Sequence, residues 1–437
     1  MTDWYLLKEQ QSSEGLRLAP DQLRDIRRAL PNLTVEPGDE EGFYHLNPAS
    51  YVGVIQLPTI GIRIGPKLPM QRVLFLWSYA FDPAHWRDRD VELPQAEDLI
   101  SALAHVFAIE LDAQMRGGLL EGYRGCAENS RTVRGRINFA EQWANDLRWR
   151  PEVAVEYEEF TADIVENRVL KAALRALRRL PMIDRETIPA LARCEQELAD
   201  ISPAHFSRGR IPDFHYHRGN QRYRRALELA RLILSGTSFD LPGDEQHSVN
   251  VRGLLFDMNK VFEEFVRAAL RDCLNEPAAR FGSVDEVQLA CALYLDVKRS
   301  VPIKPDLLWV RQDITRFVGD VKYKRVGLPL MPNADVYQML GYLIGSGLST
   351  GMLVYPLSEI AESPNRGRKI EITVNDKCFA ILVETIDTNG APDLILQEVS
   401  RLARTIERIA NEGSGAPVSA GRAGRMPTPN RAEAAPR

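Results

Sequence analysis

Residues 303–325, IKPDLLWVRQDITRFVGDVKYKR, contain two apolar runs that are separated by a short polar segment. Two runs rich in Val, Ile, Leu and aromatic residues with such a break between them are typical of a β-hairpin. Asp306 lies on the first run, and Asp320 and Lys322 lie on the second. Because carboxylates on buried strands destabilise a fold, either the two runs are not strands or these charged side chains hold a ligand.

The register of the predicted hairpin decides whether the charged residues meet. A hairpin centred on Asp313 places Asp306 directly opposite Asp320, with their Cβ atoms roughly 4.5–5.5 Å apart. Side chains alternate between the two faces of a strand, so Lys322 shares a face with Asp320. A slip by one residue would break this arrangement. The predicted register therefore brings all three charged side chains to one patch.

This patch has the composition of a divalent-metal site. Two carboxylates at such a distance repel each other unless a cation lies between them. Oxygen ligands suit Mg²⁺ or Mn²⁺, so Asp306 and Asp320 are predicted to bind one of these ions. Lys322 beside the ion would stabilise charge on a phosphoryl oxygen or lower the pKa of an attacking water. Together these groups predict metal-assisted hydrolysis of a phosphodiester.

A helix predicted before the hairpin supplies a further acidic candidate. DMNKVFEEFVRAALRDCL, residues 257–274, begins at Asp257 as its N-cap. Glu263 flanks the apolar face and is predicted to complete the metal shell or to orient water, whereas Glu264 points nearly opposite. The residues predicted to form the apolar face are Met258, Phe262, Phe265, Val266, Ala269 and Cys273.

A helix predicted after the hairpin supplies two supporting candidates. In ADVYQMLGYLIGSG, residues 334–347, Gln338 and Tyr342 are four residues apart and therefore share one helix face. The two side chains are predicted to orient the lysine or to hold a DNA phosphate.

The chain as a whole predicts an α/β fold in several parts. Residues 1–92 form a small mixed β/α domain, residues 93–245 are mainly helical, and residues 251–411 alternate strands with helices. Residues 412–437 are rich in Gly, Pro, Ala and Arg and are predicted to be disordered. Strands are predicted over 51–57 and 60–68, and helices over 20–30, 96–115, 163–180, 223–236 and 393–411.

Composition argues against several classes of protein. The chain of 437 residues carries a net charge of −5, whereas a protein that holds nucleic acid by itself is usually basic. No apolar run has the roughly 18–20 residues of a membrane span, and the N-terminal residues lack a signal-peptide pattern, so we expect a cytoplasmic location.

The five cysteines form no CxxC pair, which argues against a disulfide framework and a cysteine zinc site. No GxxxxGK[ST] loop is present, so we expect this chain to bind no nucleotide.

The charged residues of the hairpin and several other segments resemble a known family. Asp306, Asp320 and Lys322 are similar to the catalytic triplet of the PD-(D/E)xK nuclease superfamily, and the sequence as a whole is similar to the McrC family. McrC is the nuclease subunit of the McrBC 5-methylcytosine-dependent restriction system. The similar segments occur in the same order over about residues 1–410, and they are VGVIQLPTIGIRIGPKL (52–68), RGRI (134–137), ENRVLKAAL (166–174), MNKVFEEF (258–265) and DVYQMLGY (335–342).

The resemblance implies a PD-(D/E)xK nuclease domain over 251–411, with Asp306, Asp320 and Lys322 as its catalytic residues. Glu263 matches the upstream acidic position, although the adjacent Glu264 leaves that assignment open. McrC-like proteins bind a hexameric AAA+ GTPase of the McrB type and stimulate its GTP hydrolysis. The partner usually recognises modified DNA, and the McrC subunit then cuts both strands of the double-stranded DNA. Residues 1–92 would contact the partner.

Two other functions are compatible with the sequence. The chain could be an interaction subunit that activates a ring NTPase and does not cleave DNA, although the intact triplet argues against a decayed site. It could also be a nuclease of the RecB type that acts on DNA ends without a GTPase, although the long helical region before residue 245 is then unexplained.

Overall fold

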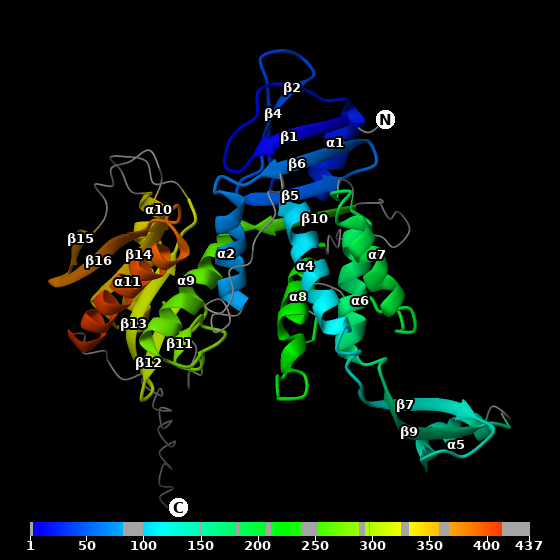
Figure 1. The fold of residues 1–437 in the computed structure, drawn as a ribbon. Helices are drawn as coiled ribbons and strands as arrows, with labels where there is room; N and C mark the ends of the chain where they lie inside the picture. The colour runs from blue at the N-terminus through cyan, green and yellow to red at the C-terminus, as the bar shows by residue number, and fades with distance from the viewer. Residues whose placement is uncertain are drawn as a thin grey trace, which may run out of the picture. The chain divides into compact units, whose positions relative to one another are not determined.

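The computed structural model describes residues 3–81, 99–147, 151–180, 183–206, 211–212, 214–237, 252–287, 293–296, 298–324, 332–357 and 367–412. The chain divides into two compact units, Met1–Val261 and Phe262–Arg437 (Figure 1). None of the helices in the described ranges combines the length and the hydrophobicity of a membrane span. Of the predicted disordered tail, only Glu412 is described, and the rest of that prediction lies outside the described residues.

The first unit begins with a four-stranded sheet in the order β1-β6-β5-β10. Strands β1 (Asp3–Lys8) and β6 (Ile60–Gly65) are parallel, and β5 (Tyr51–Gln56) pairs antiparallel with both β6 and β10 (Arg252–Asp257). A smaller sheet has the order β2-β4-β3. It lies with helix α1 (Pro20–Ala29) over a core that includes Ile26, Leu46, Ile55 and Ile62. The remaining strands are β2 (Leu16–Arg17), β3 (Thr34–Pro37) and β4 (Phe43–Asn47).

Strand β10 makes the structure differ from the predicted start of the nuclease domain at residue 251. Its residues pair with β5, about two hundred positions earlier in the sequence, so it belongs to the first unit. A glycine in β5 permits this pairing. Gly53 has φ +136°, and a Cβ there would lie 2.0 Å from the Leu254 carbonyl oxygen. A larger residue at that position would be strained and would separate the strands.

Helices make up most of the rest of the first unit, as the sequence predicts. They are α2 (Met70–Phe81), α4 (Leu99–Met115), α6 (Val165–Arg178), α7 (Ile188–Glu197), a 3₁₀ turn (Gln221–Tyr223) and α8 (Arg224–Thr237). Helix α6 packs against α7 and α8, and α4 packs against the same two helices.

A three-stranded sheet lies within this helical region, where the sequence predicts only one strand and a turn around Gly135. Its order is β7-β9-β8, from β7 (Gly122–Ser130), β9 (Val153–Thr161) and β8 (Arg136–Ile137), and helix α5 (Phe139–Leu147) packs against β9. The β7 sequence GYRGCAENS contains two glycines and no β-branched residue, so its intrinsic strand propensity is low. Pairing with β9 along its whole length stabilises it instead.

The second unit contains a six-stranded mixed sheet in the order β11-β12-β13-β14-β16-β15. The central pairs β13–β14 and β14–β16 are parallel, and the outer pairs are antiparallel. Helix α10 (Asn333–Ser346) connects β13 to β14, as is usual between parallel strands. The strands are β11 (Phe281–Gly282), β12 (Leu307–Arg311), β13 (Ile314–Val321), β14 (Thr350–Pro356), β15 (Arg368–Val374) and β16 (Lys377–Ile386).

Helices cover both faces of this sheet. Met339 and Leu343 of α10 share a core with Leu308 and Val318, so α10 lies on the face that carries these two residues. Helix α11 (Pro392–Glu412) packs against β13 and β16, and Arg401 of α11 pairs at 2.8 Å with Glu384, which points to the other face. This helix-covered arrangement is the α/β architecture that the sequence predicts.

Helix α9 (Met258–Leu274) begins as predicted, because the Asn259 N–H donates to Asp257 Oδ1 at 3.1 Å. Its apolar face packs through Phe262, whose ring centroid lies 5.5 Å from that of Tyr323. Cys273 is a correction to the predicted buried face. It is exposed, and its Sγ lies 3.4 Å from Ser400 Oγ.

Candidate functional site

The β12–β13 hairpin sets the position of the predicted metal ligands. Gln312 and Asp313 form its two-residue turn with φ values of 53° and 57°, a backbone that continues the twist of the strands. Thr315 pairs with Val310 and Phe317 pairs with Trp309, so Arg316 is the extra residue of a β-bulge.

The bulge restores the predicted register at the site. Beyond it, Leu307 pairs with Gly319, and the next pair in this register is Asp306 with Asp320. Without the bulge, the turn at 312–313 would place Asp306 opposite Gly319 instead. At this end of the hairpin, the structure therefore has the register that the sequence predicts. The turn is at 312–313 and is not centred on Asp313, and the bulge at Arg316 compensates for this difference.

The two aspartates differ in their environment. The Val321 N–H donates to Asp306 Oδ2 at 2.9 Å, and Asp306 is half-buried. Asp320 is only 1% exposed. Burial, followed by the neighbouring negative charge of Asp306, raises the pKa of Asp320 to about 8. Without a metal ion, Asp320 therefore binds a proton more readily than a solvated aspartate does.

Lys322 completes the charged patch at the end of β13. Its backbone N–H donates to the Val354 carbonyl at 2.9 Å, which fixes the residue against β14. Its Nζ lies 2.6 Å from the buried Oδ2 of Asp320, so the two side chains form an ion pair. Burial lowers the pKa of Lys322, but the charge and hydrogen bond of Asp320, together with the charges of Asp306 and Asp335, outweigh burial and raise the pKa overall. Lys322 stays cationic.

This donor set fits a hard divalent cation. Two neighbouring carboxylates repel each other and one ammonium group does not neutralise both, so a metal ion between them would be favourable. Within the described ranges, no three or more His, Cys, Asp or Glu residues gather as a metal-binding group. Asp306 and Asp320 alone are sufficient for Mg²⁺, which usually binds one or two protein carboxylates and keeps several waters.

Glu263 does not form a metal-binding group with these two aspartates in the described part of the chain. Glu263 and its neighbour Glu264 differ in their exposure to solvent. Glu264 is the solvent-facing residue, with a side chain that is 51% exposed and that accepts from Arg267 Nη1 at 2.8 Å. Glu263 is half-buried. Arg267 donates from Nε to the Asp306 carbonyl at 3.2 Å, and Glu263 lies one helical turn before it on the same face. Glu264 also lies one turn before Arg267 and pairs with it, so these contacts leave the choice between the two glutamates open.

Gln338 and Tyr342 act on the backbone that leads into β12. Gln338 Nε2 donates to the Tyr342 hydroxyl at 2.6 Å, and that hydroxyl donates to the Lys304 carbonyl at 3.0 Å. Burial, with the charge of Asp320, raises the pKa of Tyr342 to about 12, so the hydroxyl keeps its proton. These contacts hold the chain two residues before Asp306.

A third residue of α10 was missed by the sequence reading. Asp335 is 4% exposed and accepts hydrogen bonds from Lys324 Nζ at 2.8 Å and from the Tyr355 hydroxyl at 2.7 Å. It therefore anchors the first turn of α10 to the chain just beyond β13 and to β14. In the sequence, an aspartate in the first turn of a helix is typical of a solvated residue that favours the helix dipole, which hides its buried role.

Replacing Asp335 by alanine is expected to destabilise the second unit by about 3 kcal/mol, because Lys324 and the buried Tyr355 hydroxyl lose their partner. Urea denaturation of the full chain measures this change. Asp393→Ala is the matched control, since Asp393 is an exposed aspartate in the first turn of α11. Equal midpoints for the two variants would contradict the anchoring role.

Comparisons with known proteins find a family and a similar structure. The family model described as McrBC 5-methylcytosine restriction system component matches residues 46–356. A chain in the refined half-complex from the tetradecameric assembly of Thermococcus gammatolerans McrB AAA+ hexamers with bound McrC is similar with a TM-score of 0.55 and 18% identity. The match covers 92% of this chain and 100% of that chain. This likeness establishes a shared fold.

A second similar chain comes from the cryo-EM structure of the Thermococcus gammatolerans McrBC complex. Its TM-score is 0.39 at 19% identity, with 62% of this chain and 88% of that chain covered, so it does not extend the comparison. None of the curated proteins compared with the chain is significantly similar in sequence.

Proposed function

The chain belongs to the McrBC 5-methylcytosine restriction system component family, and we propose that it is the McrC-like subunit that cleaves DNA with a divalent metal ion. The observation that carries this proposal is the facing pair Asp306 and Asp320 with Lys322 beside them. Asp320 is buried beside a second carboxylate, and its pKa is raised to about 8. Such a carboxylate is costly unless it binds a cation.

Each residue of the site has a distinct task in this proposal. Asp306 and Asp320 would hold Mg²⁺ or Mn²⁺, and a bound ion supplies Lewis-acid polarisation of the scissile phosphodiester. Lys322, kept cationic by Asp320, stabilises the negative charge that develops on a phosphoryl oxygen. Gln338 and Tyr342 position the chain before Asp306. Glu263, which is half-buried on α9, would complete the metal shell or orient water.

We propose that the partner is a hexameric AAA+ GTPase of the McrB type, as described for the Thermococcus gammatolerans McrC. The net charge of −5 supports a division of labour in which the partner holds double-stranded, modified DNA and this chain cuts it. In the proposal, this chain binds no nucleotide and stimulates GTP hydrolysis by the partner.

Cleavage assays with the partner test this function. The full chain, the GTPase, GTP and Mg²⁺ together should cut methylated DNA, and omission of GTP or Mg²⁺ should prevent cutting. A closed circular substrate separates this function from that of a nuclease that acts on DNA ends, because only an internal cut linearises the circle. Stimulated GTP hydrolysis without any cleavage would instead favour a non-cleaving interaction subunit.

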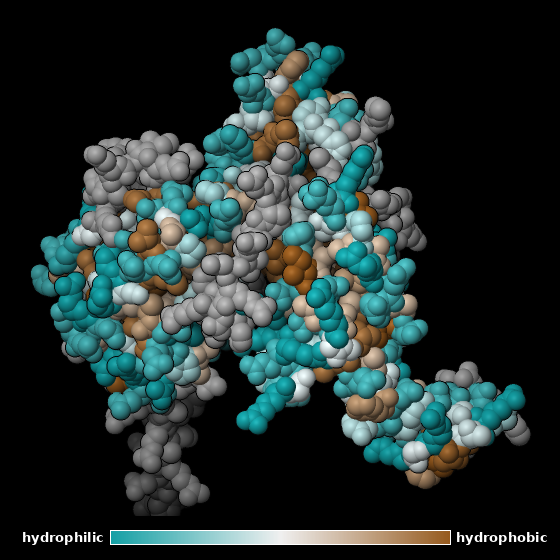
Figure 2. All heavy atoms as spheres, in the orientation of Figure 1, coloured by the Kyte–Doolittle hydropathy of each residue, from teal (hydrophilic) through white to brown (hydrophobic). Residues whose placement is uncertain are grey.

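The first unit exposes hydrophobic residues that suit a protein partner. Residues 122–161, which we call the β7–β9 module, comprise β7, β8, α5 and β9. Figure 2 shows hydrophobic side chains at the surface in the region of this module. Its large exposed hydrophobic residues are Tyr123 (74%), Val133 (60%), Phe139 (78%), Trp143 (72%) and Phe160 (58%). Exposed aromatic groups of this kind mark interaction surfaces, so we extend the proposed partner contact from residues 1–92 to this module.

Replacing Trp143 by serine is expected to weaken stimulation of the partner GTPase, raising the concentration needed for half-maximal stimulation by at least about tenfold. Phe139 lies one helical turn before Trp143 and should give a similar result. Ile109→Ser is the matched control, since Ile109 is 52% exposed on α4 outside the module. Equal stimulation by both variants would exclude the module as the contact surface.

A further inference from the structure

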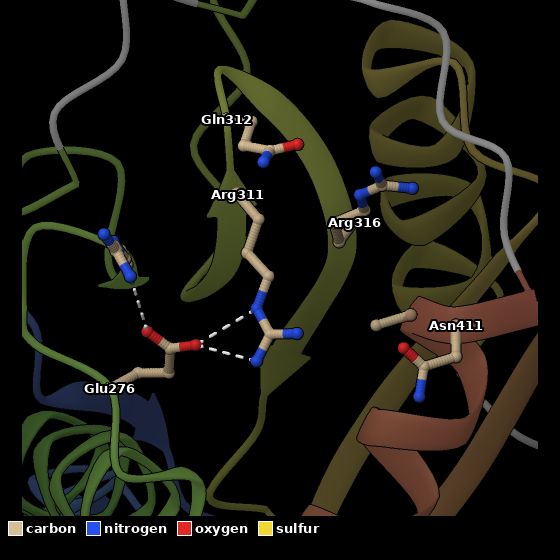
Figure 3. A pocket seen from close by; sticks show the side chains of 7 residues that line it. Glu276, Arg311, Gln312, Arg316 and Asn411 are labelled. Atoms are coloured by element: carbon tan, nitrogen blue, oxygen red, sulfur yellow. Dashed lines mark hydrogen bonds and ion pairs between the residues drawn. The ribbon is translucent and has the colours of Figure 1, made fainter.

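A pocket of ≈ 540 Å³ lies at the turn of the β12–β13 hairpin (Figure 3). The pocket lies at one end of these two strands, and Asp306 lies at the other end. Arg311 lines the pocket, and its neighbour in the strand, Val310, belongs to the core under α10. The side chains of these adjacent residues point to opposite faces of the sheet. Asp306 shares its face with that core, so Arg311 lies on the other face of the sheet. The pocket is therefore separate from the candidate metal site.

The pocket has an excess of positive charge. Three arginines and one glutamate line it. The Glu276 carboxylate, with a side chain only 8% exposed, accepts from Nε and Nη2 of Arg311 at 3.1 and 2.8 Å. Arg280 Nη1 lies 3.8 Å from the other oxygen of the same carboxylate. One buried carboxylate thus fixes two guanidinium groups and neutralises one of them.

Arg316 is the third arginine, and none of the described residues provides it with a counterion. It is half-buried, and it forms no ion pair or hydrogen bond with any part of the chain that the structure describes. Figure 3 shows it on the strand next to Arg311, lining the same pocket. Because Arg316 is the extra residue of the bulge, the irregularity that sets the register of Asp306 also directs this side chain to the pocket.

The charge balance indicates the class of ligand. Three positive side chains and one negative side chain leave a formal charge of +2, from 3 − 1. The end of α11, at Ala410 and Asn411, forms one wall and contributes roughly −0.5 through the helix dipole. Of the uncharged lining residues, Gln312 and Asn411 are polar and Ala410 is apolar, so the lining suits an anion better than an apolar ligand. Guanidinium groups match the oxygens of phosphate in both charge and geometry.

We propose that this pocket binds a phosphate group through Arg316, with Arg280 and Arg311 held ready by Glu276. The phosphate belongs either to a nucleic-acid backbone or to a free phosphate compound. The pocket does not depend on the cleavage proposed for Asp306 and Asp320, because it lies on the other face of the sheet.

Thermal unfolding of the full chain in inorganic phosphate tests the proposal. Phosphate, compared with chloride at equal ionic strength, should raise the melting temperature of the unaltered protein, and Arg316→Gln should weaken the apparent phosphate affinity at least about tenfold. Arg404→Gln is the matched control, since Arg404 is exposed on α11 and does not line the pocket. Arg316→Lys, which keeps the charge, should retain part of the response.

Three results would overturn the phosphate site. They are no response to phosphate in the unaltered protein, equal responses of Arg316→Gln and Arg404→Gln, and a lower melting temperature of Arg316→Gln with its phosphate response intact. The last would mean that Arg316 only complements the end of α11.

Duplex binding in EDTA identifies the source of the phosphate. For a nucleic-acid backbone, Arg316→Gln should weaken binding of a short duplex several-fold and reduce the slope of log affinity against log salt by about 1. For a free phosphate compound, duplex binding should be unchanged while the response to inorganic phosphate is lost. Either result supports the pocket, and neither depends on whether the Asp306 site cleaves DNA.

Discussion

Replacing Asp306 or Lys322 by alanine is expected to lower the rate of DNA cleavage by at least about 10³-fold. Asp306→Ala removes one of two facing carboxylates, so the metal ion is bound more weakly and is no longer held in the proposed position. Lys322→Ala removes the cation that stabilises charge on the phosphoryl oxygen, while both proposed ligands remain. Cleavage of methylated plasmid DNA by each variant, with partner, GTP and Mg²⁺, measures the effect.

Controls separate loss of chemistry from loss of structure. Stimulation of the partner GTPase should stay unchanged in both variants, because the site lies in the second unit and the proposed partner surface lies in the first. Asp313→Asn and Lys377→Ala are matched changes at exposed positions of the same sheet, and they should cleave normally. Normal cleavage by Asp306→Ala and Lys322→Ala would show that the site has been assigned to the wrong residues.

Replacing Asp320 by asparagine is expected to stabilise the metal-free protein at pH 8, with a rise in melting temperature of more than about 5 °C. In the folded protein, burial and the charge of Asp306 raise the pKa of Asp320 to about 8 from 3.8. Ionising this group in the folded state therefore costs a few kcal/mol. Asparagine has a similar shape and carries no charge, so the variant avoids this cost and should also lose the response to Mg²⁺.

The sign of the effect follows from proton binding. Because the folded-state pKa lies above the unfolded value, protonated Asp320 contributes stability that is fully present below about pH 4 and is lost as the pH rises to about 8. Melting curves in EDTA between pH 5 and pH 8.5 should therefore show the gap between Asp320→Asn and the unaltered protein widening with pH. Mg²⁺ should close that gap, most strongly at high pH.

A constant gap across this pH range would contradict the raised pKa. A Mg²⁺ response that persists in Asp320→Asn would contradict its role as a ligand. Asp313→Asn again serves as the control, since Asp313 is exposed in the turn and tolerates asparagine at its positive φ.

The charged patch could be predicted from the sequence because its signals are local. The apolar runs, the alternation of strand side chains and the positions of Asp306 and Asp320 all lie within one hairpin. The bulge at Arg316 could not be predicted, because nothing in TRFV distinguishes a bulged residue from a regular one. The hairpin assumed to be centred on Asp313 has its turn at 312–313, and the bulge corrects the difference.

Interactions between distant segments account for what the sequence reading missed. Strand β10 depends on β5, far earlier in the chain, and β7 has little propensity of its own. Asp335 reads as a helix-start residue, although Lys324 and Tyr355 bury it. The sequence leaves the choice between Glu263 and Glu264 open, and it does not reveal that Arg267 pairs with Glu264 and contacts the Asp306 carbonyl. Periodicity alone reports none of these contacts.

Anomalous scattering from crystals of the full chain grown with Mn²⁺ tests the central claim most directly. The account predicts one peak within bonding distance of the carboxylates of both Asp306 and Asp320, with the Lys322 ammonium nearby and no peak in crystals of Asp320→Asn. A peak elsewhere in the second unit, or carboxylates that face each other without an ion at saturating Mn²⁺, would contradict it.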